Sequence, residues 1–370
     1  MKRLLMILSL ILPLNVGANT YPYTPTGTLT KTDVLGPGDR VNSFPKYYIF
    51  NGYLSGFDIN SDLYDRNIFL CMSATDTSTG ACHTAGIGSL GATYGVSNIS
   101  LQFTERRSLI KRNLILNGYK NHVFAGNASG CGVTGNMVLN SHVYSCSLTN
   151  GTTQRSNGTL LTLFIPENEI NKLPFGGIWE ATLVLKVKRY ADFDFGTYTI
   201  NITVHLTDKG NIQVWLPDFK NSPRVDLNLR PKGSGEYVGS NTLDMCLYDG
   251  YSTNSESMEI RFYDNSGQTG SNTYYLSKIG ESSLKLPYSV SFLLGGRTLK
   301  PKNGQSFTIN DPLGLEINWN RITAVSMPEI NVPVLCWPAK LLFNANVKNP
   351  DAGQYKGHLN IIFTPSSENI

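Results

Sequence analysis

Residues 173–210 read LPFGGIWEATLVLKVKRYADFDFGTYTINITVHLTDKG, and this stretch decides the fold. Apolar side chains occupy every second position in two runs, first at Ala181, Leu183, Leu185 and Val187, then at Tyr198, Ile200, Ile202, Val204 and Leu206. Successive side chains of a β-strand leave opposite faces, so a period of two predicts strands with one buried face. Two such strands joined by a short polar turn predict an antiparallel β-hairpin.

A second stretch near the C-terminus has the same pattern. Its apolar positions are Trp337, Ala339, Leu341 and Phe343, followed by Leu359, Ile361 and Phe363. Gly-Gln-Tyr at 353–355 takes the place of Gly-Thr-Tyr at 196–198. Two copies are too few for a solenoid, where each unit buries little alone. We therefore predict two tandem domains of one architecture, each closed by such a hairpin.

The rest of the chain consists of short β-prone runs separated by Gly-, Ser-, Thr- and Asn-rich turns. In the second half we expect strands at 212–216, 225–229, 245–247, 258–262, 274–276, 288–293 and 322–334. About seven short alternating strands per half are typical of an immunoglobulin-like β-sandwich. The predicted fold is all-β, with two tandem immunoglobulin-like β-sandwich domains joined by a short linker. The polar break at 207–210 is the expected linker, which gives domains at residues 19–206 and 211–370.

The first residues have the composition of a secretion signal. A basic start is followed by an apolar run and then by the small residues that a signal peptidase needs, so residues 1–18 are a predicted signal peptide. A membrane anchor is the alternative, but the run is shorter than the ~20 residues that cross a bilayer and contains Pro13. The net charge of +4 comes without the clustered Lys and Arg of a nucleic-acid-binding protein.

Six cysteines in an exported chain favour disulfides over metal binding or catalysis. If the domain boundary lies near Lys209, Cys246 and Cys336 are alone in the second domain and must join each other. The other four leave several pairings open, of which we prefer the local pairs Cys71–Cys82 and Cys131–Cys146.

The sequence gives little sign of catalysis. The glycines at 86–91 have dinucleotide-binding spacing, but no helix pattern follows to receive a phosphate. The histidines have no metal-ligand spacing, and His205 falls on the outward parity of its strand. We therefore predict no catalytic residue, no metal site, no cofactor and no enzymatic activity. A secreted polysaccharide hydrolase is the alternative, and it would need a pair from Asp65, Glu105, Glu180 and Asp192 in one cleft.

Four arginines of the first domain lie beside predicted strands, namely Arg66, Arg106, Arg107 and Arg189. Arg189 falls where the alternation stops, which places it near a strand end. The guanidinium fork matches a carboxylate, so arginines gathered at one pole of a sandwich would suit an acidic sugar. The alternative is solvated charge at strand ends, and composition alone favours it.

Several stretches carry a resemblance to a known family. They are LYDR (63–66), LQFTERRSLIKR (101–112), LPFGGIW (173–179), GTYTINITVHLTDKGNIQVWLP (196–217), VDLNLRP (225–231), DGYSTNSESMEIRF (249–262), NWNRITAVSMPEINVPVLCWP (318–338) and AGQY (352–355). In these the sequence resembles the minor tip adhesins of class 5, alternate-chaperone fimbriae, the colonisation-factor adhesins of enterotoxigenic Escherichia coli. The likeness spans the mature chain and is densest in the second domain.

The resemblance implies that the two domains have different functions. The first would bind a receptor, and the second would be a pilin domain whose incomplete sandwich accepts a donor strand from the major fimbrial subunit. A periplasmic chaperone would hold that groove during export, and an outer-membrane usher would assemble the fibre. The chain would then reach the cell surface at the fimbrial tip.

The resemblance also implies receptor-binding residues. Of the family's three binding arginines, two carry over as Arg66 and Arg189, and the third position is Tyr190 here. The resemblance therefore favours receptor binding over solvated charge at Arg66 and Arg189, but not at Arg106 and Arg107. We expect a fimbrial tip adhesin that binds host-cell sialylated glycoconjugates. The alternative is an exported structural pilin or assembly initiator without a receptor of its own.

Overall fold

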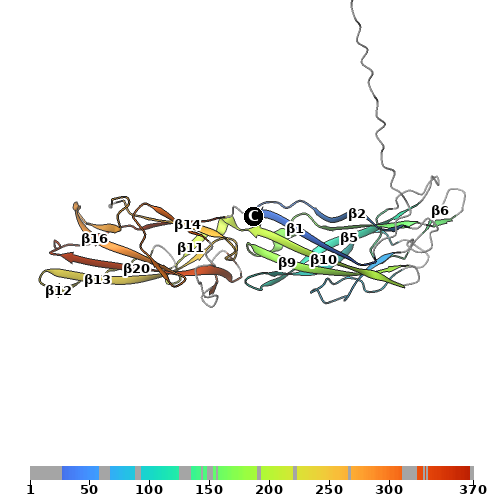
Figure 1. The fold of residues 1–370 in the computed structure, drawn as a ribbon, viewed down its shortest axis with the longest axis horizontal. Coiled ribbons are helices and arrows are strands. Elements are labelled where there is room, and N and C mark those ends of the chain that lie inside the picture. The colour runs from blue at the N-terminus through green and yellow to red at the C-terminus, as the bar shows by residue number, and fades with distance from the viewer. Residues whose placement is uncertain are drawn as a thin grey trace, which may run out of the picture.

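The computed structural model describes residues 27–57, 67–87, 93–124, 135–142, 145–147, 153–155, 157–189, 193–219, 223–265, 268–310, 323–327, 330 and 332–366. Figure 1 shows two bodies of strands placed end to end, one blue to green and the other yellow to red. The predicted signal peptide lies outside the described residues. The prediction of an all-β, two-domain fold is confirmed.

The described residues of the first body form these strands and one short 3₁₀ helix: β1 (Leu29–Asp39), β2 (Tyr47–Phe57), β3 (Ile68–Cys71), β4 (Ser97–Glu105), β5 (Lys111–Val123), β6 (Ser145–Ser147), β7 (Thr153–Arg155), β8 (Gly158–Ile165), η1 (Ile170–Lys172), β9 (Gly177–Arg189) and β10 (Phe193–Thr207). One sheet runs in the order β1-β10-β9-β4-β5-β8-β2, and β3 also pairs with β9. The Tyr47 hydroxyl lies 3.3 Å from the Asp33 carboxylate, which brings the two ends of the sheet together over one core.

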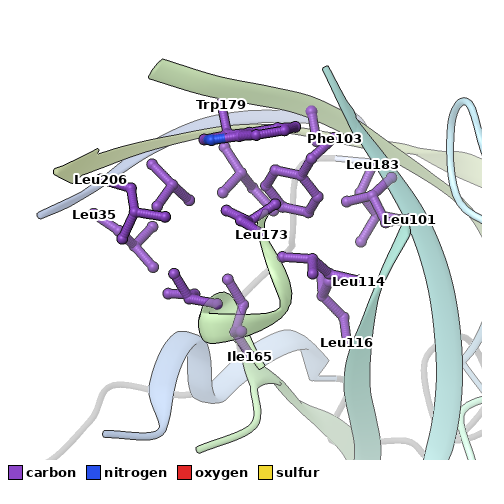
Figure 2. Close-up of a cluster of buried hydrophobic side chains, with 14 of the residues drawn as sticks. Leu35, Leu101, Phe103, Leu114, Leu116, Ile165, Leu173, Trp179, Leu183 and Leu206 are labelled. Carbon is purple, nitrogen blue, oxygen red and sulfur yellow. The ribbon is translucent and has the colours of Figure 1, made fainter. Parts of the chain in front are cut away.

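The hairpin of β9 and β10 is confirmed, with Leu183 opposite Ile200 in an antiparallel register. Figure 2 shows the core that it covers, where Trp179 lies over Phe103 and Leu173. The indole Nε1 of Trp179 donates to the Phe175 carbonyl oxygen at 3.3 Å, so this buried side chain keeps a hydrogen-bond partner. The alternating apolar residues of both strands are buried, as their parity predicts.

In the second body, the part of the chain that the structure describes forms a short 3₁₀ helix and the following strands: η3 (Lys209–Asn211), β11 (Gln213–Trp215), β12 (Arg230–Gly233), β13 (Glu236–Tyr248), β14 (Ser257–Tyr263), β15 (Thr273–Lys278), β16 (Glu281–Leu294), β17 (Arg297–Leu299), β18 (Ser306–Asn310), β19 (Thr323–Val325), β20 (Val334–Lys348), β21 (Tyr355–Lys356) and β22 (Asn360–Pro365). One layer is built on the order β11-β13-β20-β16-β15-β21, and the other is the three-stranded sheet β18-β14-β22.

The predicted C-terminal hairpin is wrong. In the described part of the chain, β20 pairs with β13, β16 and β19, whereas β22 pairs with β14 in the opposite layer. Alternation shows that one face of a strand is buried, but it does not show which strand lies beside it. Between β20 and β22 the chain crosses to the other layer, and β21 pairs with β15 on the way.

Two of the predicted disulfides are confirmed. Cys71–Cys82 and Cys246–Cys336 have Cα–Cα distances of 5.3 Å and 5.6 Å. Cys131 lies outside the described residues, so the pair Cys131–Cys146 stays a prediction.

Candidate functional site

Arg189 lies at the end of the first body that faces away from the second. It is the last residue of β9, and its half-buried guanidinium lies 5.8 Å from the centre of the Phe193 ring at the start of β10. Phe193 is 61% exposed. Next to this pair, Lys188 Nζ lies 3.8 Å from the Asp194 carboxylate. A guanidinium beside an exposed aromatic ring is suited to an acidic sugar, because the fork can bind a carboxylate while the ring packs on the sugar.

The strand β3 leads into the same pole. It pairs with β9 from Cys71–Leu185 to Ile68–Lys188, so the register continued by one residue sets Asn67 opposite Arg189. Arg66 precedes Asn67 in the chain. Arg66 and Tyr190 both lie outside the described residues, and their placement beside Arg189 stays a prediction.

The arginine pair Arg106 and Arg107 belongs to the opposite end of the body. Arg106 Nη2 lies 2.6 Å from Glu180 Oε1, with both side chains about half exposed, and Arg107 Nε donates to Asn254 Oδ1 of the second body at 2.9 Å. Glu180 lies near the start of β9 and Arg189 at its end, nine residues apart, or about 30 Å along a strand. The structure therefore separates these arginines from Arg189.

The two bodies meet at a buried carboxylate. Glu105 has 0% exposure. Its Oε2 accepts hydrogen bonds from Arg107 N at 3.0 Å, from Ser108 N at 2.6 Å and from Ser108 Oγ at 2.7 Å. From the second body, Ser252 Oγ donates to Oε2 at 3.3 Å and Asn254 Nδ2 to Oε1 at 3.2 Å. Glu105 is thus a shared acceptor for donors of both domains.

Apolar contacts make this junction continuous. Cys246, Tyr248, Met327, Val334 and Cys336 of the second body belong to the same buried cluster as Trp179 and Leu206 of the first. The expected linker at 207–210 contributes to it, because Asp208 is buried and its backbone N–H donates to the Gly250 carbonyl at 2.7 Å. The junction is therefore packed like a protein interior.

His205 is a component of this junction. The sequence places it on the surface, but it is half-buried, and its Nδ1 lies 2.7 Å from the Tyr251 hydroxyl of the second body. Burial lowers the pKa of His205 below its ordinary value of 6.5, and the nearby positive charge of Arg106 lowers it further. Protonation of His205 is therefore disfavoured in the folded chain.

Sequence reasoning missed the junction, although one signal was present. Glu105 continues the inward parity of Ile99, Leu101 and Phe103 along β4, so it falls on the buried face. A charged residue at such a position needs hydrogen-bond donors around it. The sequence does not show that some of those donors come from the second domain.

The second body has one layer that ends on an unpaired strand. Within the described residues, β22 pairs only with β14, and its other edge has no neighbouring strand. Ile361 and Phe363 pack on the core yet stay partly exposed. The predicted strand at 225–229 is also unpaired in this part of the structure, although Val225, Leu227 and Leu229 pack on the same core. Among the residues that the structure describes, this layer therefore has an open edge over apolar side chains.

Sites of two other kinds do not occur among the described residues. No helix in them is both long and apolar enough for a membrane crossing. No group of His, Cys, Asp and Glu in them could hold a metal ion.

The chain matches two family models in succession. Both models describe CfaE, the E subunit of CFA/I fimbriae: the one for its first domain matches residues 18–209, and the one for its second domain matches residues 212–367. The CFA/I fimbrial E subunit of Escherichia coli is 52% identical over 344 residues, which cover 93% of this chain and 92% of that protein.

Solved structures agree with this assignment. The crystal structure of CfaE, the adhesive subunit of CFA/I fimbria of enterotoxigenic Escherichia coli, has a TM-score of 0.84 at 52% identity, covering 94% of this chain and 95% of that chain. A chaperone–tip adhesin complex of CFA/I fimbriae biogenesis contains a chain with a TM-score of 0.73 at 47% identity, covering 95% of this chain and 99% of that chain. The protein therefore belongs to the CfaE family, the fimbrial tip adhesins of the bacterial surface.

Proposed function

We propose that this chain binds an acidic host-cell glycoconjugate through the pole of residues 19–206 and acts without catalysis. Arg189 carries the proposal, because it offers a half-buried guanidinium beside the exposed Phe193 ring at the end of the molecule away from the second body. The resemblance adds Arg66 and Tyr190 to the same pole. A carboxylate such as that of sialic acid matches the planar fork of an arginine and can accept two parallel hydrogen bonds from it.

The second part of the proposal concerns residues 211–370. We infer that the open edge of β22 accepts a strand donated by the major fimbrial subunit. A strand added there would pair its backbone with β22 and cover Ile361 and Phe363 with alternate side chains. An unfilled edge of this kind is an aggregation hazard, so a periplasmic chaperone would hold it until an outer-membrane usher places the chain at the fibre tip.

The experiment is a comparison of binding and stability in the full-length mature chain. Arg189→Ala should weaken binding to sialylated erythrocytes about 30-fold or more, the value of one charged, bidentate contact. Arg112→Ala is the matched control, because Arg112 is exposed at the start of β5 and distant from Arg189. Sialidase treatment of the cells should give the same loss as Arg189→Ala.

Thermal unfolding of both variants should equal that of the parent chain. Unchanged erythrocyte binding by Arg189→Ala would remove this pole as the receptor site. If the parent chain binds neither erythrocytes nor enterocytes, the result favours the alternative of a structural pilin or assembly initiator without a receptor of its own.

A further inference from the structure

The first domain buries one lysine completely. Lys120 on β5 has 0% exposure and is among the largest fully buried side chains of the described residues. An ammonium group removed from water is costly unless protein oxygen atoms replace its hydration. The oxygen atoms that accept from the Lys120 ammonium therefore indicate which part of the fold this buried charge stabilises.

The ammonium of Lys120 holds the end of β3. Its Nζ donates a hydrogen bond of 2.7 Å to the backbone carbonyl oxygen of Asn67, the residue directly before β3. Asn67 is itself fully buried, and its side-chain amide has no hydrogen-bond partner among the described residues. The bond from Lys120 is thus a side-chain contact that fixes the backbone of Asn67.

A neighbouring segment keeps β5 and β3 at a set distance. Met137 exchanges two backbone hydrogen bonds of 2.9 Å with Lys120, and two residues later the Leu139 carbonyl accepts one of 3.0 Å from Phe69 N. Met137 and Leu139 are both 1% exposed. Lys120 therefore extends from a backbone position that is itself fixed.

The residue that Lys120 holds lies at the receptor pole. The β3–β9 pairing reaches Ile68–Lys188, and the next position in this register sets Asn67 opposite Arg189. Displacement of the Asn67 backbone would change the support on one side of Arg189. It would also move the chain at the position that directly follows Arg66.

We propose that Lys120 is a positioning residue of the receptor pole. Its ammonium fixes the Asn67 carbonyl and so holds the end of β3 against Arg189. This role rests on the proposed function of Arg189. It assigns to Lys120 no contact with the glycan, because a fully buried side chain cannot reach one.

The test uses Lys120→Met, which keeps most of the side-chain length and removes the ammonium. In the full-length chain we expect about tenfold weaker binding to sialylated erythrocyte membranes, as for the loss of one charged hydrogen bond. Hydrogen exchange without the membranes should be at least about tenfold faster at the amides of β3, while the amides of β8 keep the parent rates. Lys186→Met, an exposed lysine on β9, should match the parent chain in both measurements.

A second variant separates positioning from stability. Lys120→Gln keeps a neutral donor for the Asn67 carbonyl and should recover part of the binding and part of the β3 protection. Parent-level binding by Lys120→Met overturns the proposal, and so does equal acceleration of exchange in β3 and β8. Failure of both variants to fold also overturns it, because Lys120 is then a general stabiliser.

The hydrogen-exchange measurement tests the positioning role of Lys120 separately from the proposed receptor binding by Arg189. If Arg189→Ala binds normally, the receptor pole is wrong, and the role of Lys120 in receptor binding falls with it. If Arg189→Ala loses binding while Lys120→Met leaves β3 exchange and binding unchanged, the proposed function stands and only the positioning role fails.

Discussion

Replacing the carboxylate of Glu105 is the sharpest test of the domain junction. In Glu105→Gln the side-chain volume is unchanged, but one oxygen becomes an amide nitrogen that only donates. If the amide nitrogen takes the place of Oε1, it faces the donors Asn254 Nδ2 and Ile178 N, which lie 3.2 Å and 3.3 Å from Oε1. On the Oε2 side it would face the backbone N–H groups of Arg107 and Ser108. Neither orientation satisfies every group.

The expected cost follows from these contacts. Three hydrogen bonds to Oε2 are 3.0 Å or shorter. A hydrogen bond to a charged group is worth about 1 kcal/mol more than a neutral one, so removal of the charge costs about 3 kcal/mol. The amide nitrogen and the donors that it faces repel each other, which increases the loss. A neutral amide is less costly to bury than a carboxylate, which decreases it. We therefore expect a loss of about 3 kcal/mol in the free energy of unfolding.

The assay is urea unfolding of the full-length chain, followed by near-ultraviolet circular dichroism. Glu180→Gln is the control, since Glu180 is half exposed and pairs with Arg106 across the surface, where such a pair contributes at most about 1 kcal/mol. A Glu105→Gln chain that unfolds within about 0.5 kcal/mol of the parent would refute the reasoning. The donors would then be satisfied by water, and the junction would not depend on the carboxylate.

Three further predictions concern other parts of the chain. Because burial lowers the pKa of His205, the unfolded chain binds its proton more readily, so stability falls as the pH drops below 6.5. His205→Gln should show a smaller fall in melting temperature between about pH 7.5 and about pH 5.5 by calorimetry. Replacing Cys246 and Cys336 together by Ser should cost about 4–5 kcal/mol in urea unfolding, since they are 90 residues apart; a loss below about 1 kcal/mol would contradict the chain-entropy argument. Amides of β22 should exchange faster in the isolated chain than in assembled fimbriae, and equal rates would exclude strand addition at this edge.

The sequence was most informative where one strand face is buried and the next strand follows after a short turn. The alternation around Leu183 and Ile200 predicted both strands and their pairing, because a short connection leaves few other partners. The same alternation at Leu341 and Ile361 predicted the two strands, but their predicted pairing is wrong, because a longer connection crosses to the other layer. Periodicity reports burial, and the length of the connection limits the choice of neighbour.

The candidate sites also differ in how much of each could be predicted from the sequence. Arg189 was placed at a strand end because the alternation stops there, and the structure agrees. Glu105, considered from the sequence only as a possible member of a carboxylate pair, is buried at the junction. Lys120 likewise continues the inward parity of Leu114 and Leu116 along β5, but parity does not show which oxygen atom accepts from its ammonium. Contacts between distant segments are what a single sequence does not contain.

The pairing of β1 with β10 has a consequence for biogenesis. These strands are parallel, with Leu29 beside Tyr198 and Val34 beside Thr203, so the first strand of the domain closes against the last one. During synthesis and translocation β1 must wait for nearly the whole domain before its partner emerges. Such closure between distant segments is slow and leaves strand edges uncovered meanwhile. The first domain therefore needs protection from premature association until its final strand has arrived.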